Sequence, residues 1–177
     1  MVDIPELETP RLRLRARRLD DFDAFAEIWA SPSVVRFVGG VPLSREAAWG
    51  RFLRQVGHWQ FVGFGYFAVE DRATGRFIGE VGFQDMRRDI VPSIEGLMEA
   101  GWILAEEAQG RGLADEAMRA ALLWADAHGT GDRIACIIHP DHAGSLRVAE
   151  KLGFVTMGEG RYNGGSMVML ERPRPGS

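Results

Sequence analysis

The segment from residue 101 to residue 125 restricts the fold of this chain more than any other. An apolar run that ends at Ile103-Leu104 is followed by a turn containing Gly110 and Gly112, and then by apolar residues at helical spacing. Glycine permits a tight turn and a close approach of the backbone to a ligand. The pattern therefore predicts a strand that leads through this turn into an amphipathic helix. The apolar face of that helix would consist of Leu113, Ala117, Met118, Ala121, Leu122 and Ala125.

The same turn predicts a site for an anion. The first backbone N–H groups of a helix have no partner inside the helix, and together with the helix dipole they attract negative charge. A diphosphate group would fit there. A dinucleotide site of the Gly-x-Gly-x-x-Gly type is disfavoured because Asp115 stands at the third glycine position, and no P-loop motif occurs. Taken alone, the glycine pair is equally compatible with a turn that only reverses the chain.

The rest of the chain predicts strands and helices in a mixed order. Apolar residues alternate at period 2 in some segments and recur at helical spacing in others, and residues 71–75 are typical of a hairpin loop. We expect the order β-α-α-β-β-β-α-β-α-β-β, an α/β fold with a mixed sheet (α+β) and helices on its faces. Residues 1–177 would form a single domain with a core over about residues 7–172. The expected strands cover residues 12–16, 64–70, 76–84, 94–104, 133–138, 154–158 and 167–171, and the expected helices cover residues 20–30, 44–58, 110–128 and 141–152.

Three local features of the first elements can be compared directly with the structure. Leu12, Leu14 and Ala16 alternate with arginines, which predicts a strand with a buried apolar face and a solvated arginine face. Asp20 or Asp21 is the expected N-cap of the first helix, and Ser44 that of the second. The expected inner stripe of the second helix consists of Trp49, Phe52, Leu53 and Val56.

Composition excludes several classes of function. The net charge of -4 argues against a general nucleic-acid-binding surface, which requires an excess of Lys and Arg. The single cysteine, Cys136, rules out an intramolecular disulfide and cysteine-based metal clusters, and we expect no metal. The chain has no signal-peptide-like apolar run near its start and no apolar stretch of about 18 residues, so we expect a cytoplasmic protein without a membrane partner.

Two motifs resemble those of a known family. Gln109-Gly110-Arg111-Gly112-Leu113-Ala114 matches the Gln/Arg-x-x-Gly-x-Gly/Ala signature of GNAT N-acetyltransferases. The segment from His139 to Ser145, followed by Lys151-Leu152-Gly153-Phe154, resembles the family's Pro-x-Asn-x-x-Ser and Lys-Leu-Gly-Phe pattern. The opening residues 8–14 resemble the branch that includes ribosomal-protein N-terminal acetyltransferases. The likeness covers about residues 7–172, with one departure, because His142 stands where that branch usually has Asn.

The resemblance implies the GNAT fold and the transfer of an acetyl group from acetyl-CoA to an amine, which attacks the thioester directly in a ternary complex. It assigns the general base to Glu99 and the general acid to Tyr162, with Glu80 as a weaker candidate base. Backbone N–H groups where the strand ending at Leu104 parts from its neighbour would bind the carbonyl oxygen. The implied coenzyme-binding residues are Ile103, Leu104, Gln109, Gly110, Arg111, Gly112, Leu113, Ala114, His142 and Ser145.

Several alternatives remain open at this point. Glu99 is also compatible with a salt-bridged acid, and Tyr162 with a loop residue in a segment of turn composition. Ser145 is equally compatible with stabilising the first turn of its helix. The acceptor could be a small-molecule amine or a protein N-terminus, and exposed strand edges make a homodimer plausible. The alternative function is a coenzyme-binding sensor that has lost catalysis.

Overall fold

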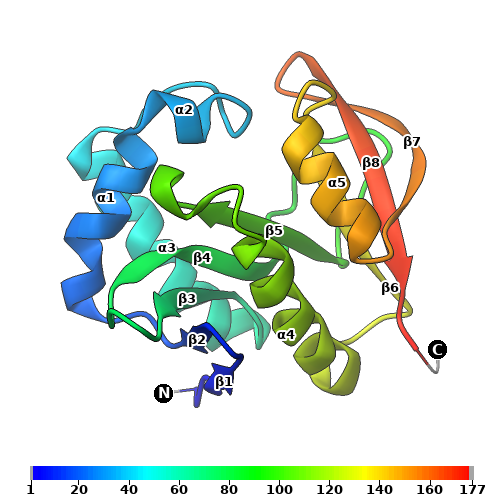
Figure 1. Cartoon of the computed structure of the whole chain (residues 1–177). Coiled ribbons are helices and arrows are strands. Elements are labelled where there is room, and N and C mark those ends of the chain that lie inside the picture. The colour runs from blue at the N-terminus through cyan, green and yellow to red at the C-terminus, as the bar shows by residue number, and fades with distance from the viewer. Residues whose placement is uncertain (1, 176–177) are drawn as a thin grey trace.

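One mixed sheet organises residues 2–175, which the computed structural model describes (Figure 1). Its eight strands lie in the order β1-β2-β3-β4-β5-β6-β8-β7, and β5 and β6 form its only parallel pair within these residues. The strands are β1 (Leu7–Glu8), β2 (Leu12–Arg15), β3 (Tyr66–Asp71), β4 (Phe77–Gln84), β5 (Met98–Leu104), β6 (Arg133–Ile138), β7 (Val155–Tyr162) and β8 (Gly165–Pro173).

Helices cover this sheet. Figure 1 shows α4 in front of the central strands, α1 packed on α3, and α5 beside β6 and β8. The α-helices are α1 (Phe22–Ala30), α2 (Pro32–Val35), α3 (Arg45–Val62), α4 (Leu113–His128) and α5 (Ala143–Lys151). Two short 3-10 turns, η1 (Leu19–Asp21) and η2 (Glu106–Ala108), precede α1 and α4.

The mixed sheet with covering helices confirms the predicted fold class and the predicted sequence of main elements. The structure adds the two-residue strand β1 and the single-turn helix α2. It also starts β5 at Met98 rather than at residue 94, and it extends β7 and β8 into a hairpin closed by Asn163 and Gly164. Ser44 caps α3 as expected, because its hydroxyl accepts a hydrogen bond from the Ala47 backbone N–H at 3.1 Å.

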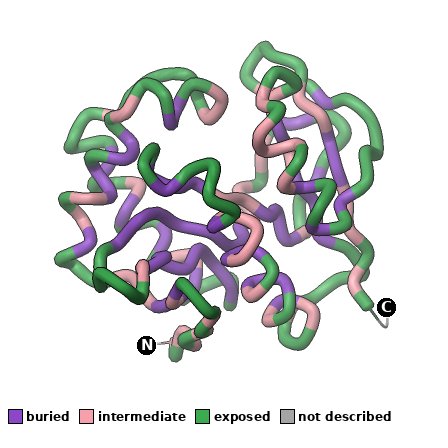
Figure 2. Tube along the Cα trace, in the orientation of Figure 1, coloured by how far each residue is buried: buried purple, intermediate pink, exposed green. Residues whose placement is uncertain are grey.

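The main core lies between the helices and the central strands. Figure 2 shows buried residues along the middle of the sheet and on the inner side of α4. The predicted apolar face of α4 is confirmed, because all six of its residues are buried. Cys136 is also buried in β6, and burial raises the pKa of its thiol, which suits a small core residue better than a nucleophile.

The prediction of a solvated arginine face on the first strand is wrong for Arg15 and Arg17, whose side chains are both buried. The Arg15 side chain donates two hydrogen bonds to the Asp21 carboxylate at 2.7 and 2.8 Å, and donates a third to Glu70 at 2.7 Å. Hydrogen bonding to Asp21 and Glu70 outweighs burial and raises the pKa of Arg15. Asp21 is therefore used in this ion pair and does not cap α1 with its side chain. Alternation alone does not show which arginines have a buried carboxylate opposite them.

The predicted inner stripe of α3 is also wrong. Only Phe52 of the four predicted residues is buried, whereas Trp49, Leu53 and Val56 are exposed. The helix instead buries the row Ala48, Phe52, Gln55 and Trp59. The Trp59 indole N–H donates to the Tyr66 carbonyl at 3.0 Å, which fixes this face of the helix toward the sheet.

No helix in the described part of the chain is long and apolar enough to cross a bilayer. Within residues 2–175, no three His, Cys, Asp or Glu side chains gather where they could hold a metal ion.

The buried Arg15 ion pair yields a prediction about stability. Asp21→Asn should lower the free energy of unfolding by about 3 kcal/mol, because it leaves part of a buried charge without its partner. Asp23→Asn is the matched control, since Asp23 pairs with Arg45 at the exposed start of the same helix and should cost less than about 1 kcal/mol. Urea denaturation followed by circular dichroism measures both values. Equal losses would contradict the importance assigned to the buried pair.

Candidate active site

The two parallel strands β5 and β6 part soon after they meet. Their register contains only Met98 opposite Ile134 and Glu99 opposite Ala135, although β5 continues to Leu104. Over that length β5 stays paired with β4, while β6 pairs along its length with β8. The residues of β5 after Glu99 therefore have an unpaired edge facing an opening between the two halves of the sheet.

The ladder shows which backbone groups face this opening. The Ala105 N–H donates to the Ile78 carbonyl of β4 at 2.9 Å. Since backbone groups alternate in direction along a strand, Ile103 also bonds toward β4, whereas Trp102 and Leu104 direct their N–H and C=O groups away from it. Of the predicted pair Ile103 and Leu104, Leu104 is thus the one whose backbone groups face the opening. Its carbonyl accepts a hydrogen bond from the Gln109 side chain at 3.0 Å.

The predicted anion turn lies directly beyond the end of β5. Gly110 and Gly112 both have left-handed backbone conformations, with φ of 70° and 73°, and both are exposed. Gly112 occupies the N-cap of α4, and no side chain caps the helix there. The first N–H groups of α4 are therefore available to an external acceptor. Leu113 is buried beneath the turn, whereas Arg111 is exposed beside it.

Nearby arginines compensate the two carboxylates in the first turn of α4. Glu116 accepts hydrogen bonds from Arg11, whose Nε lies 2.6 Å from it, and from the Thr9 hydroxyl. Burial would raise the pKa of Glu116, but these hydrogen bonds prevail and lower it. Asp115 pairs with Arg119 at 3.0 Å. Since both carboxylates are paired, their negative charges are largely compensated at the start of α4.

His142 occupies the N-cap position at the start of α5. Its ring stacks on Phe37, which follows α2, with 4.6 Å between the ring centroids. Burial, and to a lesser extent the neighbouring His139, lowers the pKa of the His142 imidazole. This contact joins the segment after α2 to the start of α5, two regions that flank the opening.

Ser145 lies one turn further along α5. Its hydroxyl accepts a hydrogen bond from the Trp102 indole N–H at 3.3 Å. Trp102 is a β5 residue, so its side chain extends across the opening from one strand to the facing helix. Ser145 thus faces β5 from α5, and its predicted contact with the coenzyme remains a prediction.

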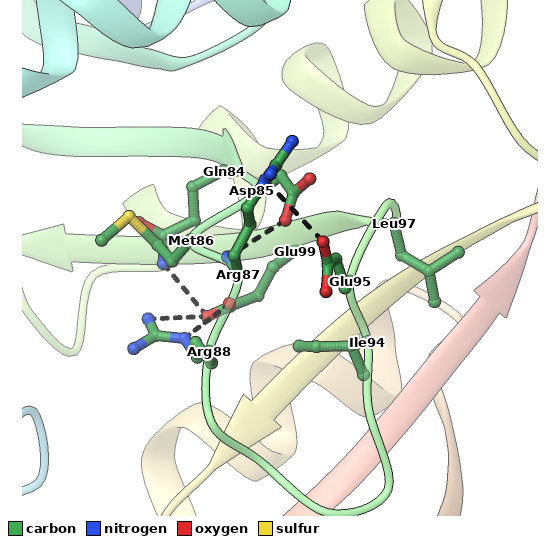
Figure 3. Close-up of a pocket in the computed structure, with 9 residues that line it drawn as sticks. All are labelled: Gln84, Asp85, Met86, Arg87, Arg88, Ile94, Glu95, Leu97 and Glu99. Carbon is green, nitrogen blue, oxygen red and sulfur yellow. Dashed lines mark hydrogen bonds and ion pairs between the residues drawn. The ribbon is translucent and has the colours of Figure 1, made fainter.

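Glu99 and Tyr162, the two predicted catalytic residues, meet through Arg88. The guanidinium of Arg88 donates to both oxygens of Glu99 at 2.7 and 3.0 Å, and to the Tyr162 hydroxyl at 2.8 Å. Gln84 donates a further hydrogen bond to Glu99 at 3.0 Å (Figure 3). The structure therefore shows the salt-bridged Glu99 that the sequence left open. It also places Tyr162 at the end of β7, within the hairpin rather than in a free loop.

The hydrogen-bonding roles in this group are well defined. Burial would lower the pKa of Arg88, but its bonds to Glu99 and Tyr162 prevail and raise it, so the guanidinium remains charged. Because Arg88 can only donate, the Tyr162 oxygen accepts and its own proton is free to be donated elsewhere. The hollow around Glu99 that Figure 3 shows has no room for a water molecule.

Glu80, the weaker candidate base, is buried in β4 on the same face of the sheet as Glu99. It accepts hydrogen bonds from Arg17 and from the Trp29 indole N–H. Both of its oxygens therefore have partners, which favours a structural role for Glu80.

Sequence reasoning missed Arg88, Arg11 and Phe37. Arg88 lies in a polar loop beside another arginine, Arg87, and the sequence contains no signal that distinguishes the two. Arg11 was grouped with the other arginines of the first strand. The spacing of apolar residues indicates which face of a helix is buried, as it did for α4. It cannot indicate the contact of Phe37 with His142, because these residues lie more than a hundred positions apart in the sequence.

Comparison with known proteins decides the family. A family model described as an acetyltransferase (GNAT) domain matches residues 11–155. This chain belongs to the GNAT acetyltransferase family. The uncharacterized protein YkkB of Bacillus subtilis (strain 168) is 31% identical over 157 residues, which cover 84% of each chain.

Solved structures of GNAT proteins agree with this assignment. A GNAT-family acetyltransferase from Bordetella pertussis is 33% identical, with a TM-score of 0.83 over 95% of this chain and 99% of that one. The ribosomal L7/L12 alpha-N-protein acetyltransferase RimL, in complex with coenzyme A, has a TM-score of 0.76 at 16% identity, covering 98% of this chain and all of that one. The latter likeness concerns the fold.

The stacked pair at the opening of this GNAT protein can be tested in solution. Phe37→Ala should expose the His142 imidazole and raise its pKa toward the ~6.5 of an exposed histidine, because water then solvates the charged form. NMR titration of the ring protons measures the change. His58, whose pKa burial also lowers, lies on α3 and is the internal control that should keep its value. An unchanged pKa for His142 would show that the stack does not form in solution.

Proposed function

We propose that this GNAT protein transfers the acetyl group of acetyl-CoA to a primary amine, which attacks the thioester directly in a ternary complex. The observation that supports this best is the combination of two features at one opening. The exposed, uncapped start of α4 lies immediately beyond the unpaired edge of β5. The uncapped start of α4 can bind an anion, and the adjacent edge of β5 offers backbone N–H donors.

The turn before α4 fits a diphosphate. A Cβ added to Gly112 would have no heavy atom within 3.4 Å and only one within 4 Å, an Arg11 nitrogen at 3.8 Å. The space beside Gly112 is therefore open and next to a cation. In this proposal, Gly110, Arg111, Gly112, Leu113 and Ala114 would hold the pyrophosphate of the coenzyme through backbone N–H groups. Gln109 would support the turn from behind through its bond to Leu104.

The remainder of the coenzyme would lie along the opening. Leu104 would contact the coenzyme through its backbone, and Ile103 would contact it from the adjacent position on β5. His142 and Ser145 would contact it from the start of α5. When bound, acetyl-CoA supplies an activated acyl group as a thioester. The N–H groups of Trp102 and Leu104 are directed into the opening, where they can stabilise charge on a carbonyl oxygen without any contribution from a particular side chain.

We assign the proton transfers to the group joined by Arg88. Tyr162 is oriented by Arg88 with its proton free, which is the arrangement required of a general acid for a leaving thiolate. Glu99 is the candidate base, acting directly on the amine, and Arg88 and Gln84 fix its position. If Glu99 is instead only structural, its role is to hold Arg88 in place for Tyr162.

Two acceptor classes remain open at the level of this proposal, a small-molecule amine and a protein N-terminus. The RimL neighbour acts on ribosomal protein L7/L12, but at 16% identity this likeness concerns the fold alone. The competing function is a coenzyme-binding sensor without catalysis. Thiol release from acetyl-CoA in the presence of an amine panel supports the enzyme. Thermal stabilisation by coenzyme A without turnover on the panel supports the sensor.

Gly112→Asp should weaken coenzyme A binding at least about tenfold, because it places a carboxylate against the phosphates. Gly75→Asp is the matched control, since Gly75 in the β3–β4 hairpin has a similar φ of 69° and equally open surroundings. Both variants experience the same backbone strain, and they differ only in their distance from the turn. Isothermal titration calorimetry measures the affinities. Equal affinities for the two variants would refute this placement of the diphosphate.

Tyr162→Phe should lower kcat by about tenfold to a thousandfold while leaving coenzyme affinity unchanged, because it removes a proton donor but keeps the ring.

Glu99→Gln should lower kcat as well, again with little effect on coenzyme binding. Steady-state thiol release and calorimetry provide the two readouts. Full activity of Tyr162→Phe would eliminate Tyr162 as the acid, and full activity of Glu99→Gln would eliminate Glu99 as the base.

A further inference from the structure

Arg51 is a cation without a carboxylate partner. It lies on α3 with its guanidinium carbon 3.7 Å from the centre of the Trp29 ring. Its Nε is fully buried and has no hydrogen-bond partner, and the side chain forms no ion pair or hydrogen bond within residues 2–175. The buried side chains of Arg15 and Arg17, on the same side of the sheet, each have a carboxylate partner, whereas Arg51 is partly buried. A ligand could therefore supply the hydrogen-bond acceptor that the Arg51 guanidinium lacks.

Other unsatisfied polar atoms lie on the elements around Arg51. Arg17 stacks between Phe25 and Phe52, and its Nε and Nη1 are buried without hydrogen-bond partners. Gln55, one helical turn after Arg51, is buried with its Oε1 unsatisfied. Buried polar atoms without partners are rare in native proteins, so such a concentration calls for an explanation.

The charges of this region are unbalanced. Arg17 and Arg51 together provide two positive charges, and Glu80 pairs with Arg17 and also acts on Arg51. Burial lowers the pKa of Arg51, although Glu80 partly counteracts this effect. The positive charges of Arg54 and Arg88 act in the same direction as burial. A partly buried guanidinium whose buried Nε–H has no acceptor is suited to completion by an anion.

The region adjoins the opening where the acetyl group would lie. Tyr66 pairs with Gly82 on β4, which pairs with Gly101 on β5, so the three share one face of the sheet. A Cβ added to Gly101 would lie 2.0 Å from the Tyr66 hydroxyl, so this hydroxyl lies directly on β5. Tyr66 is also within electrostatic reach of Arg51. The unbalanced charge thus lies one side chain away from the strand that borders the opening.

We propose that the acceptor amine carries a carboxylate, and that Arg51 binds this carboxylate on the α1–α3 side of β5. The inference rests on the proposed acetyl transfer and specifies its substrate class. A guanidinium presents parallel N–H donors that match a carboxylate, and stacking on Trp29 fixes the plane of the fork. Burial raises the pKa of Tyr66, so its hydroxyl stays neutral and can donate a further hydrogen bond.

The same carboxylate could belong to a free amino acid or to an acidic side chain of a peptide. The experiment therefore uses two sets of matched acceptors. The first set pairs glycine, β-alanine and 4-aminobutyrate with their amides. The second set pairs an alanyl-aspartyl peptide amide with its alanyl-asparaginyl counterpart. Within each pair the carboxylate is the main difference, and the three amino acids vary its distance from the amine.

The variants are Arg51→Gln and Arg51→Lys, with Arg45→Gln as the matched control on the exposed start of the same helix. The wild type should prefer the acid of at least one pair by about tenfold to a hundredfold in kcat/KM. This ratio should approach one in Arg51→Gln, recover in part in Arg51→Lys, and remain unchanged in Arg45→Gln. A carboxylate also alters the basicity of the amine, so the acid-to-amide ratio is compared between proteins rather than read as a single value.

Each outcome has a distinct meaning. Preference for the amino acids assigns the small-molecule source, and preference confined to the aspartyl peptide assigns the peptide source. Turnover without any acid preference, or a preference that survives Arg51→Gln, would overturn the carboxylate site and leave acetyl transfer standing. Absence of turnover on every amine would instead count against the proposed function. In that case, stabilisation of the wild type but not of Arg51→Gln by propionate would still support the anion site.

Discussion

The short parallel contact between β5 and β6 is the constraint on which the other features of the site depend. Because this pairing ends at Glu99 and Ala135, the chain must keep β5 in place from the other side, through β4, and β6 through β8. The unpaired backbone of β5 would be costly if it were buried without partners. The Gln109 side chain removes part of that cost by donating to the Leu104 carbonyl, and in the proposed function the N–H groups of this edge serve a ligand. The turn and α4 then start at the end of this edge, so the uncapped start of α4 follows closely on the backbone N–H groups of β5 that point away from β4.

Charge pairing determines what each side of β5 can do. On the α1–α3 side, the buried acids Glu70, Glu80 and Glu99 are each bound by an arginine from another element. Buried ion pairs of this kind are fixed in position by the residues around them, and they fix the orientation of neighbouring side chains. The Arg88 pair orients Tyr162, and the Arg17 pair orients the aromatic rings of α1 and α3. Within residues 2–175 Arg51 forms no such pair, and this difference is the basis for the proposed carboxylate site.

Errors in reading the sequence have a common physical origin. The apolar residues of α3 suggested a face containing Trp49, Leu53 and Val56. The helix instead turns Trp59 inward, where its indole N–H donates to the Tyr66 carbonyl and its ring packs on Phe67 of β3. The arginines of the first strand looked like a solvated row, but Arg15 faces two carboxylates from segments far apart in sequence. In both cases the hydrophobicity of the residues did not indicate which side chains are buried, because the groups that they contact in the interior include polar ones.

The sequence by itself determined the order of the main elements, the buried face of α4, the glycine turn before it and the family to which the chain belongs. These features are local, since turn conformation, helix capping and apolar spacing depend on residues close together in the chain. It also selected Glu99 and Tyr162 as candidates. Only the tertiary structure decided that Arg88 joins them, that Phe37 stacks on His142 and that Arg51 has no carboxylate partner in the part of the chain that the structure describes. Those facts depend on which side chains face one another after distant strands and helices pack, and no local pattern encodes that arrangement.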